Sequence, residues 1–416
     1  MDMPSYFEYG CNVPIVSGHQ VLEKIPGILA DLGARKPLII TDKGVAGAGL
    51  VDILQSAIGN RIAIGGVEED VPADAPEAAV IAIAAAYRQH QCDALIALGG
   101  GSVLDAAKAV NILVSENADS LSAFLGSVGV KRKLRPLVAV PTTAGTGSET
   151  TQVAVIKNEA THRKMTIVSP FLSVDAAVLD SRMTLSLPPA VTAATAMDAM
   201  THAIEAFTCL AKNPLSDAGA FEAIKLISHY LPRVMQTPDD REGRLALAIA
   251  ATTAGMSFGN ALPGMIHAIG HAVGVVGGVP HGNCMAMLLP YGLEYNMHKN
   301  ADLTARLLVA LADADTYART PRLQRADTVV KMVRDLNAML HQYCGNRFPR
   351  YLKEVQDGDG KPVLASSMLP QIARAALDDA EILLNPEDLD YADILMVLEH
   401  AWDGRSLDRS RVRRGC

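Results

Sequence analysis

The stretch Asp93-Ala-Leu-Ile-Ala-Leu-Gly-Gly-Gly-Ser-Val-Leu-Asp-Ala-Ala-Lys-Ala-Val110 contains an apolar run, three glycines and an alanine-rich run in direct succession. The apolar run is typical of a buried parallel strand, and the alanine-rich run is typical of a helix. The same succession precedes it: Lys36 to Asp42 and Arg61 to Gly65 are predicted strands, whereas Val45 to Ala57 and Pro76 to Gln89 are predicted helices. This alternation predicts an α/β fold with a doubly wound parallel sheet.

The glycine turn lies where the strand ends and the next helix begins. Backbone amides and the helix dipole at such a place bind a pyrophosphate, and a residue without a β-carbon lets the phosphate approach. A tight turn also explains a glycine triplet, but the position between strand and helix favours cofactor binding. The G-x-G-x-x-G fingerprint is absent, so the site is expected to be Rossmann-like only. The candidate pyrophosphate residues are Gly99, Gly100, Gly101 and Ser102.

Two further features of this half have two interpretations each. Asp42 ends a predicted strand, where a carboxylate accepts hydrogen bonds from an adenosine ribose and repels a 2′-phosphate, favouring NAD over NADP. It is equally suited to cap the next helix. The loop Pro141-Thr-Thr-Ala-Gly-Thr-Gly-Ser-Glu149 is dense in hydroxyls and amides. Such a loop lines a dinucleotide or forms a polar turn held by its own side chains.

The character of the chain changes at Pro188-Pro189, after which nearly every segment is helical by period or composition. We therefore predict two domains: an α/β dinucleotide-binding domain over 1–187, and an all-helical metal-binding and catalytic domain over 188–416.

The helical half carries metal-ligating side chains at regular intervals. Asp198 and His202 are four residues apart in a run of helix formers, and His267 and His271 repeat that interval before His281. Residues four apart share one face of a helix. A divalent transition metal accepts imidazole and carboxylate together, and an open coordination position polarises a substrate oxygen. No Lys or Arg occurs in 183–211 or 251–297, so a metal explains these histidines better than separate core or surface roles. The ligands are expected to come from two helices and a loop.

Composition narrows the functional classes. The 416 residues carry a net charge of −8, which gives no electrostatic footprint for nucleic acid. Six scattered cysteines indicate neither a disulfide framework nor a thiolate metal site, and they fit a reducing cytoplasm. The N-terminus has no leader pattern and no apolar run is long enough to span a bilayer, so no membrane association is expected.

The motifs together resemble those of the iron-containing (group III) alcohol dehydrogenases, which belong to the dehydroquinate-synthase-like superfamily. The resemblance extends from about Val13 to Trp402. It rests on the following motifs, which occur in the family's order: Thr41-Asp-Lys-Gly44, Gly99-Gly-Gly-Ser102, the loop 141–149, Met197-Asp-Ala-Met-Thr-His-Ala-Ile-Glu-Ala206 and Gly264-Met-Ile-His-Ala-Ile-Gly-His271. Where members commonly have Pro-Asn-Pro, this chain has Val71-Pro-Ala-Asp-Ala-Pro76, and the segment 341–369 is longer than in short members.

The resemblance implies residue roles and cofactors. It assigns a divalent metal, usually Fe²⁺ with Zn²⁺ or another ion as alternatives, to Asp198, His202, His267 and His281. His271 corresponds to a non-ligand histidine near the nicotinamide, and we predict a catalytic role for it in proton relay. The cofactor NAD is matched to Asp42, to the glycine turn, to Thr142 and Thr143, and to Lys164. Apart from the resemblance, a homo-oligomer, a dimer or larger, is expected.

The predicted reaction is hydride transfer between NAD(H) and a small to medium uncharged primary alcohol or its aldehyde. Alternatives are a dehydroquinate-synthase-like lyase, a glycerol-dehydrogenase-like polyol dehydrogenase, and a regulatory protein that binds metal and nucleotide without turnover. A buried phosphate or carboxylate needs a cationic partner, which the metal-bearing segments lack. Lys164 is the nearest candidate cation in the other domain. Apolar candidates for a substrate wall, with Asn260 as a polar exception, are Met197, Phe258, Leu262, Met265 and Ile266.

Overall fold

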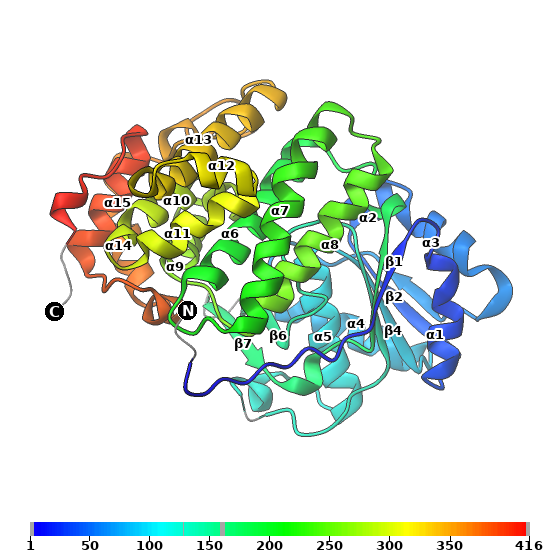
Figure 1. Cartoon of the computed structure of the whole chain (residues 1–416). Helices are drawn as coiled ribbons and strands as arrows, with labels where there is room; N and C mark the ends of the chain where they lie inside the picture. The colour runs from blue at the N-terminus through cyan, green and yellow to red at the C-terminus, as the bar shows by residue number, and fades with distance from the viewer. Residues whose placement is uncertain (1–3, 128, 159–162, 413–416) are drawn as a thin grey trace. The chain divides into compact units, whose positions relative to one another are not determined.

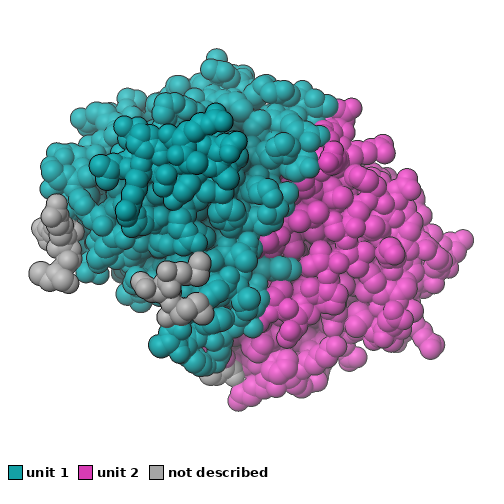
Figure 2. Space-filling view, viewed as in Figure 1, with its two compact units in different colours: residues 1–9, 188–238, 256–416 teal, residues 10–187, 239–255 magenta. Residues whose placement is uncertain are grey.

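The computed structural model describes residues 4–127, 129–158 and 163–412. The chain divides into two compact units (Figure 2). Unit 2 comprises Gly10–Leu187 and Asp239–Gly255, and unit 1 comprises Met1–Tyr9, Pro188–Pro238 and Met256–Cys416. Residues 239–255 thus group with the first half of the chain although they follow it in sequence. The domain boundary drawn from the sequence stays a prediction, because compactness does not show which parts fold independently.

Unit 2 is built on a six-stranded sheet in the order β1-β8-β5-β4-β2-β3, and every neighbouring pair is parallel. The α/β fold class with a parallel sheet is therefore confirmed (Figure 1). The strands are β1 (Ile15–Gly18), β2 (Pro37–Ile40), β3 (Gly66–Glu68), β4 (Ala94–Gly99), β5 (Leu137–Pro141) and β8 (Ala176–Asp180). An antiparallel pair, β6 (Val153–Asn158) and β7 (Arg163–Val168), stands apart from this sheet.

Alternate strand residues point to opposite faces of the sheet, so the sheet has two separate apolar faces, and different helices cover them. Leu38 and Ile40 belong to one buried cluster, and Ile39 between them belongs to the other. The first cluster includes residues of α4 (Glu77–Gln89) and α5 (Gly101–Glu116). The second includes residues of α1 (Ile25–Asp31) and α3 (Leu50–Ile58). Helices on both faces make the sheet doubly wound.

The strand predicted at Arg61 to Gly65 was wrong, because β3 begins only at Gly66. Residues Gly59–Arg61 form a 3₁₀ turn instead. A β-carbon on Gly65 would lie 2.3 Å from Sγ of Cys92, so the glycine lets the chain pass close to that buried thiol. Such a non-local contact leaves no trace in the apolar pattern that was used to place the strand.

Unit 1 is helical, as predicted for the second half of the chain. Its described helices include α6 (Pro189–Thr208), α7 (Pro214–Gln236), α9 (Met265–Gly277), α10 (His281–Tyr295), α11 (Met297–Leu311), α12 (Ala314–Arg319), α13 (Arg325–Tyr343), α14 (Leu369–Leu377) and α15 (Tyr391–Asp403). The remaining helix α8 (Arg241–Phe258) extends from residues of unit 2 into unit 1. No helix in the described ranges is long and apolar enough to cross a membrane.

Candidate functional site

The predicted metal-binding side chains come from three helices of unit 1. Asp198 and His202 lie on α6, His267 on α9, and His281 is the first residue of α10. The expectation that His281 lies on a loop was wrong. Pro280 occupies the N-cap position of α10 with extended backbone, so the helix starts at the histidine itself.

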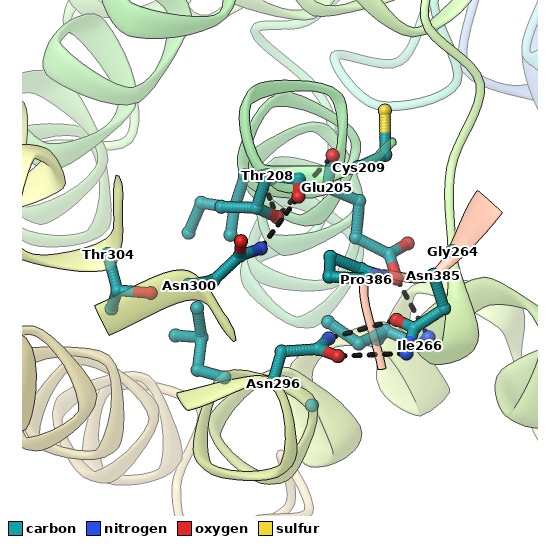
Figure 3. A pocket seen from close by; sticks show the side chains of 13 residues that line it. Glu205, Thr208, Cys209, Gly264, Ile266, Asn296, Asn300, Thr304, Asn385 and Pro386 are labelled. Atoms are coloured by element: carbon teal, nitrogen blue, oxygen red, sulfur yellow. Dashed lines mark hydrogen bonds between the residues drawn. The ribbon is translucent and has the colours of Figure 1, made fainter. Parts of the chain in front are cut away.

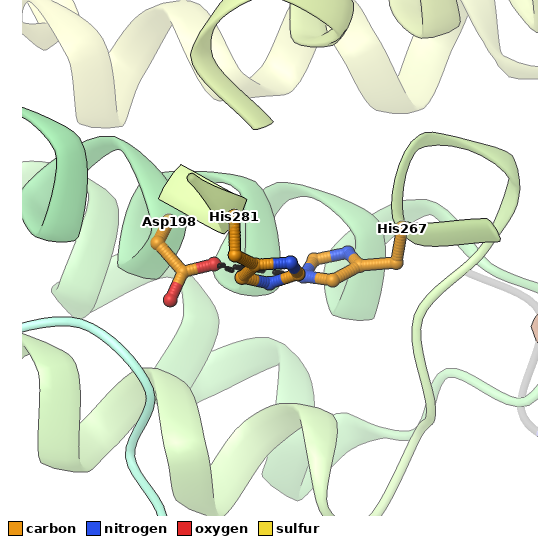
Figure 4. A group of neighbouring side chains, drawn as sticks. All are labelled: Asp198, His267 and His281. Atoms are coloured by element: carbon orange, nitrogen blue, oxygen red, sulfur yellow. Dashed lines mark ion pairs between the residues drawn. The ribbon is translucent and has the colours of Figure 1, made fainter. Parts of the chain in front are cut away.

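Three of these residues form one compact group. One ligand atom each of Asp198, His267 and His281 lie within 4.8 Å of one another (Figure 4). Oδ1 of Asp198 lies 3.1 Å from Nε2 of His281 and 3.9 Å from Nε2 of His267. His202 borders the group, with Nδ1 4.0 Å from Oδ1 of Asp198 and its ring stacked on that of His267 at 4.4 Å between centroids.

The group fits a cation by its unsatisfied atoms. Nδ1 of His202 and Nε2 of His267 are buried and have no hydrogen-bond partner within the described chain. Buried polar atoms are nearly always paired, so two imidazole nitrogens left in this way beside a carboxylate call for a ligand. The donor set of carboxylate and imidazole suits Fe²⁺ or Zn²⁺.

The protonation states also suit a metal. Burial lowers the pKa of His202 to about 3 and holds the pKa of His267 well below its usual value. Burial alone would raise the pKa of Asp198, but the neighbouring imidazoles and a hydrogen bond from His281 outweigh it, and the pKa is lowered. Neutral imidazoles and an ionised carboxylate are the forms that coordinate a cation.

Glu205 contacts the candidate ligand His267 and was not among the residues predicted from the sequence. Its Oε2 lies 2.5 Å from Nδ1 of His267, and its Oε1 accepts a hydrogen bond from the backbone N–H of Ile266 at 2.8 Å. A carboxylate on the second nitrogen of a ligating histidine fixes the tautomer and the orientation of the ring. Glu205 is seven residues after Asp198, two turns along the same helix face, and this spacing was the available signal.

A small pocket beside Glu205 supports the start of α9 (Figure 3). In it Asn296 and Asn385 exchange two side-chain hydrogen bonds of 2.9 and 2.8 Å. Oδ1 of Asn385 also accepts from the backbone N–H of Met265 at 3.4 Å. These bonds fix the turn that leads to His267, so the polar residues of the pocket have a structural role.

Gly282 brings α10 close to α6. A β-carbon on this residue would lie 2.3 Å from the carbonyl oxygen of Ala194, which is one turn before Asp198 on α6. Only glycine therefore lets the first turn of α10 approach closely enough to place His281 beside Asp198. The N-terminal end of α10 also carries the positive pole of the helix dipole, which favours an ionised carboxylate nearby.

His271 lies next to the group and has its own acidic partners. Its ring stacks on His281 at 5.2 Å between centroids, and its Nδ1 lies 2.8 Å from Oδ2 of Asp379. Oε2 of Glu381 is 3.6 Å from the same nitrogen. Asp379 and Glu381 begin a short 3₁₀ segment far along the chain, and no sequence pattern pointed to them.

The predicted cofactor residues lie in unit 2. Gly99 ends β4, Gly100 is the N-cap of α5, and Gly101 and Ser102 form its first turn. No side chain caps this helix, so its first-turn amides keep their capacity to bind an anion. Close approach of a phosphate, the reason expected for the glycines, is not the only one. A β-carbon on Gly101 would lie 2.8 Å from Cγ2 of Thr146, so a glycine is also required for the loop that packs there.

The other cofactor candidates have distinct surroundings. Asp42 is the N-cap of α2 (Lys43–Gly47), and its Oδ1 accepts from the N–H of Val45 at 2.9 Å. The capping interpretation thus describes its observed contact, while its effect on NAD preference stays a prediction. Thr142 is buried and donates its N–H to the carbonyl of Gly99 at 3.0 Å, and Thr143 packs beside Gly100. Lys164 is exposed on β7.

Comparison with known proteins gives one consistent result. The family description "Iron-containing alcohol dehydrogenase" matches residues 12–181, and its C-terminal counterpart matches residues 192–402. The NAD-dependent methanol dehydrogenase of Bacillus methanolicus is 35% identical over 72% of this chain and 78% of its own length. The 1,3-propanediol dehydrogenase of Klebsiella pneumoniae is 32% identical over 89% and 92%. The structure of an alcohol dehydrogenase from Oenococcus oeni superimposes with a TM-score of 0.87 at 29% identity, over 95% of this chain and all of that one (100%).

Proposed function

The chain belongs to the iron-containing alcohol dehydrogenase family, and we propose that within it the preferred substrates are small to medium uncharged primary alcohols and their aldehydes. The chain is an enzyme of the NAD-dependent alcohol oxidoreductase class, as the resemblance implied. The lyase and the non-enzymatic regulatory alternatives are therefore set aside.

The observation that carries the proposal is the convergence of Asp198, His267 and His281 around buried imidazole nitrogens without partners. We assign the metal to these three residues and to His202. A divalent metal bound there supplies a Lewis acid that favours the alkoxide form of an alcohol at neutral pH. NAD supplies the hydride acceptor, and we assign it to Asp42, the glycine turn, Thr142, Thr143 and Lys164.

The side chains around the metal set have separate tasks. Glu205 accepts a hydrogen bond from Nδ1 of His267, and the ring is thereby oriented with Nε2 toward Asp198. Asp379 holds Nδ1 of His271, which leaves Nε2 of that ring as the atom proposed to carry the alcohol proton away. The ring of Phe258 stacks on that of His202 with 4.0 Å between the centroids, so an apolar side chain covers one face of this proposed ligand.

Charge near the metal set supports an uncharged substrate. The sequence showed no cation in the ligand-bearing segments, and the structure adds the carboxylates of Asp379 and Glu381 next to His271. Burial alone would raise the pKa of Asp379, but its hydrogen bond to His271 outweighs that effect. The pKa is therefore lowered, and the group is anionic. A phosphate or carboxylate on the substrate would meet repulsion there.

The expected apolar wall is smaller than the sequence indicated. Met197, Met265 and Ile266 are buried in the helical core, with exposed fractions of 0%, 0% and 2%. Phe258 is the residue of that set whose ring contacts a proposed ligand.

The test is anaerobic purification followed by metal analysis and steady-state assays with NADH. We expect about one divalent ion per chain and loss of both metal and turnover in Asp198→Ala and His267→Ala, because each removes a ligand. Full metal occupancy in both variants would refute the ligand assignment. Butanal should give a higher kcat/KM than glycolaldehyde phosphate or pyruvate, and the reverse order would refute the substrate class.

We also propose a cytoplasmic homo-oligomer, a dimer or larger. The cysteines in the described ranges are free thiols, which supports a reducing compartment. Light scattering of the purified holoenzyme tests the assembly, and a monomer mass at micromolar concentration would refute it.

A further inference from the structure

The ammonium group of Lys108 is buried in unit 2 and lies among five acceptor atoms. Lys108 is on α5, two turns after the glycine turn, and its exposed fraction is 0%. Its Nζ donates to the carbonyls of Ser148 at 2.7 Å, Val153 at 2.8 Å and Thr151 at 3.0 Å, and lies 3.0 and 3.2 Å from the hydroxyls of Thr151 and Ser148. The acceptors belong to Ser148 in the hydroxyl-rich loop, to Thr151 just after it, and to Val153, the first residue of β6.

Asp105 completes the contact from one turn earlier on α5. Its Oδ1 accepts from the hydroxyl of Ser148 at 2.7 Å, and its Oδ2 accepts from the N–H of Val155 at 3.1 Å. A buried ammonium is costly unless it is paired and hydrogen-bonded. The ammonium of Lys108 is therefore stabilised by hydrogen bonds to the loop backbone, and these bonds fix α5 to the far end of the loop.

The near end of the same loop lies on the glycine turn. The N–H of Thr142 donates to the carbonyl of Gly99 at 3.0 Å. A β-carbon on Gly100 would be 3.3 Å from Oγ1 of Thr143, so the threonine packs directly on the turn. Thr142 and Thr143 therefore lie against the glycine turn, directly before the first turn of α5.

The other side of the loop is held by α8. Gly147 has a φ of +62°, and its β-carbon would lie 2.5 Å from Cα of Gly255. Oε1 of Glu149 accepts a hydrogen bond from the hydroxyl of Thr252 at 2.6 Å. The loop therefore lies between two helices of unit 2, and Lys108 supplies the contacts to the helix that carries the glycine turn.

We propose that Lys108 is a positioning residue of the cofactor site, which fixes the loop 141–151 so that Thr142 and Thr143 remain against the glycine turn. This inference rests on the proposed binding of NAD at that turn. Without the ammonium, the buried carbonyls of Ser148, Thr151 and Val153 would each lose a charged donor, and the loop would shift to compensate. Lys108 lies two helical turns beyond the glycine turn, so it would not contact the phosphates itself. Its replacement should therefore weaken cofactor binding through the displaced loop.

The test compares Lys108→Met with the wild-type holoenzyme by titration with NADH and by steady-state kinetics. We expect Kd for NADH and KM for NAD to rise by about tenfold or more, the scale of one or two lost hydrogen bonds, with kcat at saturating NAD changed far less. Metal content should be unchanged. The matched control is Leu29→Ala, a substitution at a fully buried residue of the other face of the sheet.

The outcomes separate the inference from the proposed function. Unchanged NADH affinity in Lys108→Met, or an equal loss in Leu29→Ala, would overturn the positioning role while leaving the function intact. If the wild type itself binds no NADH, the proposed function fails instead. Should Lys108→Met not fold, Ser148→Ala removes one hydroxyl shared by Lys108 and Asp105, and a several-fold rise in Kd supports the role, whereas an unchanged Kd overturns it.

Discussion

Oε2 of Glu205 lies 2.5 Å from Nδ1 of His267, while Nε2 of the same ring lies 3.9 Å from Oδ1 of Asp198. Burial raises the pKa of Glu205 to about 7. The two nitrogens of one histidine therefore have different partners, a supporting carboxylate on one side and the proposed ligand set on the other. This arrangement orients the ring before any metal binds.

Glu205→Gln should weaken metal binding by about 10- to 100-fold, because the amide cannot replace the carboxylate that orients His267. Competition with a chelator of known affinity measures the change. Glu294→Gln is the control, since Glu294 is a buried glutamate at the other end of α10 that pairs with Arg334. Equal metal affinity in Glu205→Gln and the wild type would contradict the supporting role.

Gly282→Ala should lower both stability and metal occupancy. The added methyl group would overlap the carbonyl of Ala194, and overpacking of this kind costs about 1–3 kcal/mol. Moving α10 away would also separate His281 from Asp198. Gly358→Ala is the control within unit 1, because nothing lies within 4 Å of its added β-carbon. Normal metal content in Gly282→Ala would show that the site tolerates the shift.

His271→Ala should reduce kcat by about 100-fold or more, the usual contribution of a positioned acid or base, while the metal is retained. Asp379→Asn should give a smaller loss, because the ring keeps a hydrogen-bonding neighbour at Nδ1. Metal analysis and single-turnover rates are measured on the same preparations. Loss of metal in His271→Ala would identify the residue as a ligand or as its support.

Asp42→Ser separates the two roles of Asp42. Serine also caps a helix, so stability should be kept, whereas loss of the charge should improve kcat/KM with NADP relative to NAD. Asp42→Ala removes both properties and should in addition cost about 1 kcal/mol of stability. Cofactor selectivity that stays the same in both variants would leave Asp42 as a cap alone.

The stability of the wild type should rise between about pH 8 and pH 10.5 relative to that of Lys108→Met. Burial lowers the pKa of Lys108 from its ordinary 10.5 to about 8, against the opposing effect of Asp105 and Glu149. In that range the folded protein has lost a proton that the unfolded chain still binds, so the free energy of unfolding increases with pH. Across the whole range, the free energy of unfolding of the wild type should increase by about 3 kcal/mol relative to that of Lys108→Met.

Urea unfolding of both proteins at several pH values tests this prediction. Parallel stability curves for wild type and Lys108→Met would show that Lys108 is not strained by burial.

The sequence by itself determined the features that depend on short-range geometry. The alternation of apolar and helical runs predicted the parallel sheet, and the interval of four residues placed Asp198 with His202 on one helix. These follow from the fixed periods of strands and helices, which are written in consecutive residues. The glycine turn between β4 and α5 was recognisable for the same reason.

Tertiary structure alone decided how distant segments meet. It put His281 at the start of a helix, brought that helix against Ala194 through Gly282, and set Glu205 behind His267. It also paired His271 with Asp379, more than a hundred residues away. Contacts of this kind depend on close packing between elements, and a sequence pattern records which face of a helix is buried without recording what that face will touch.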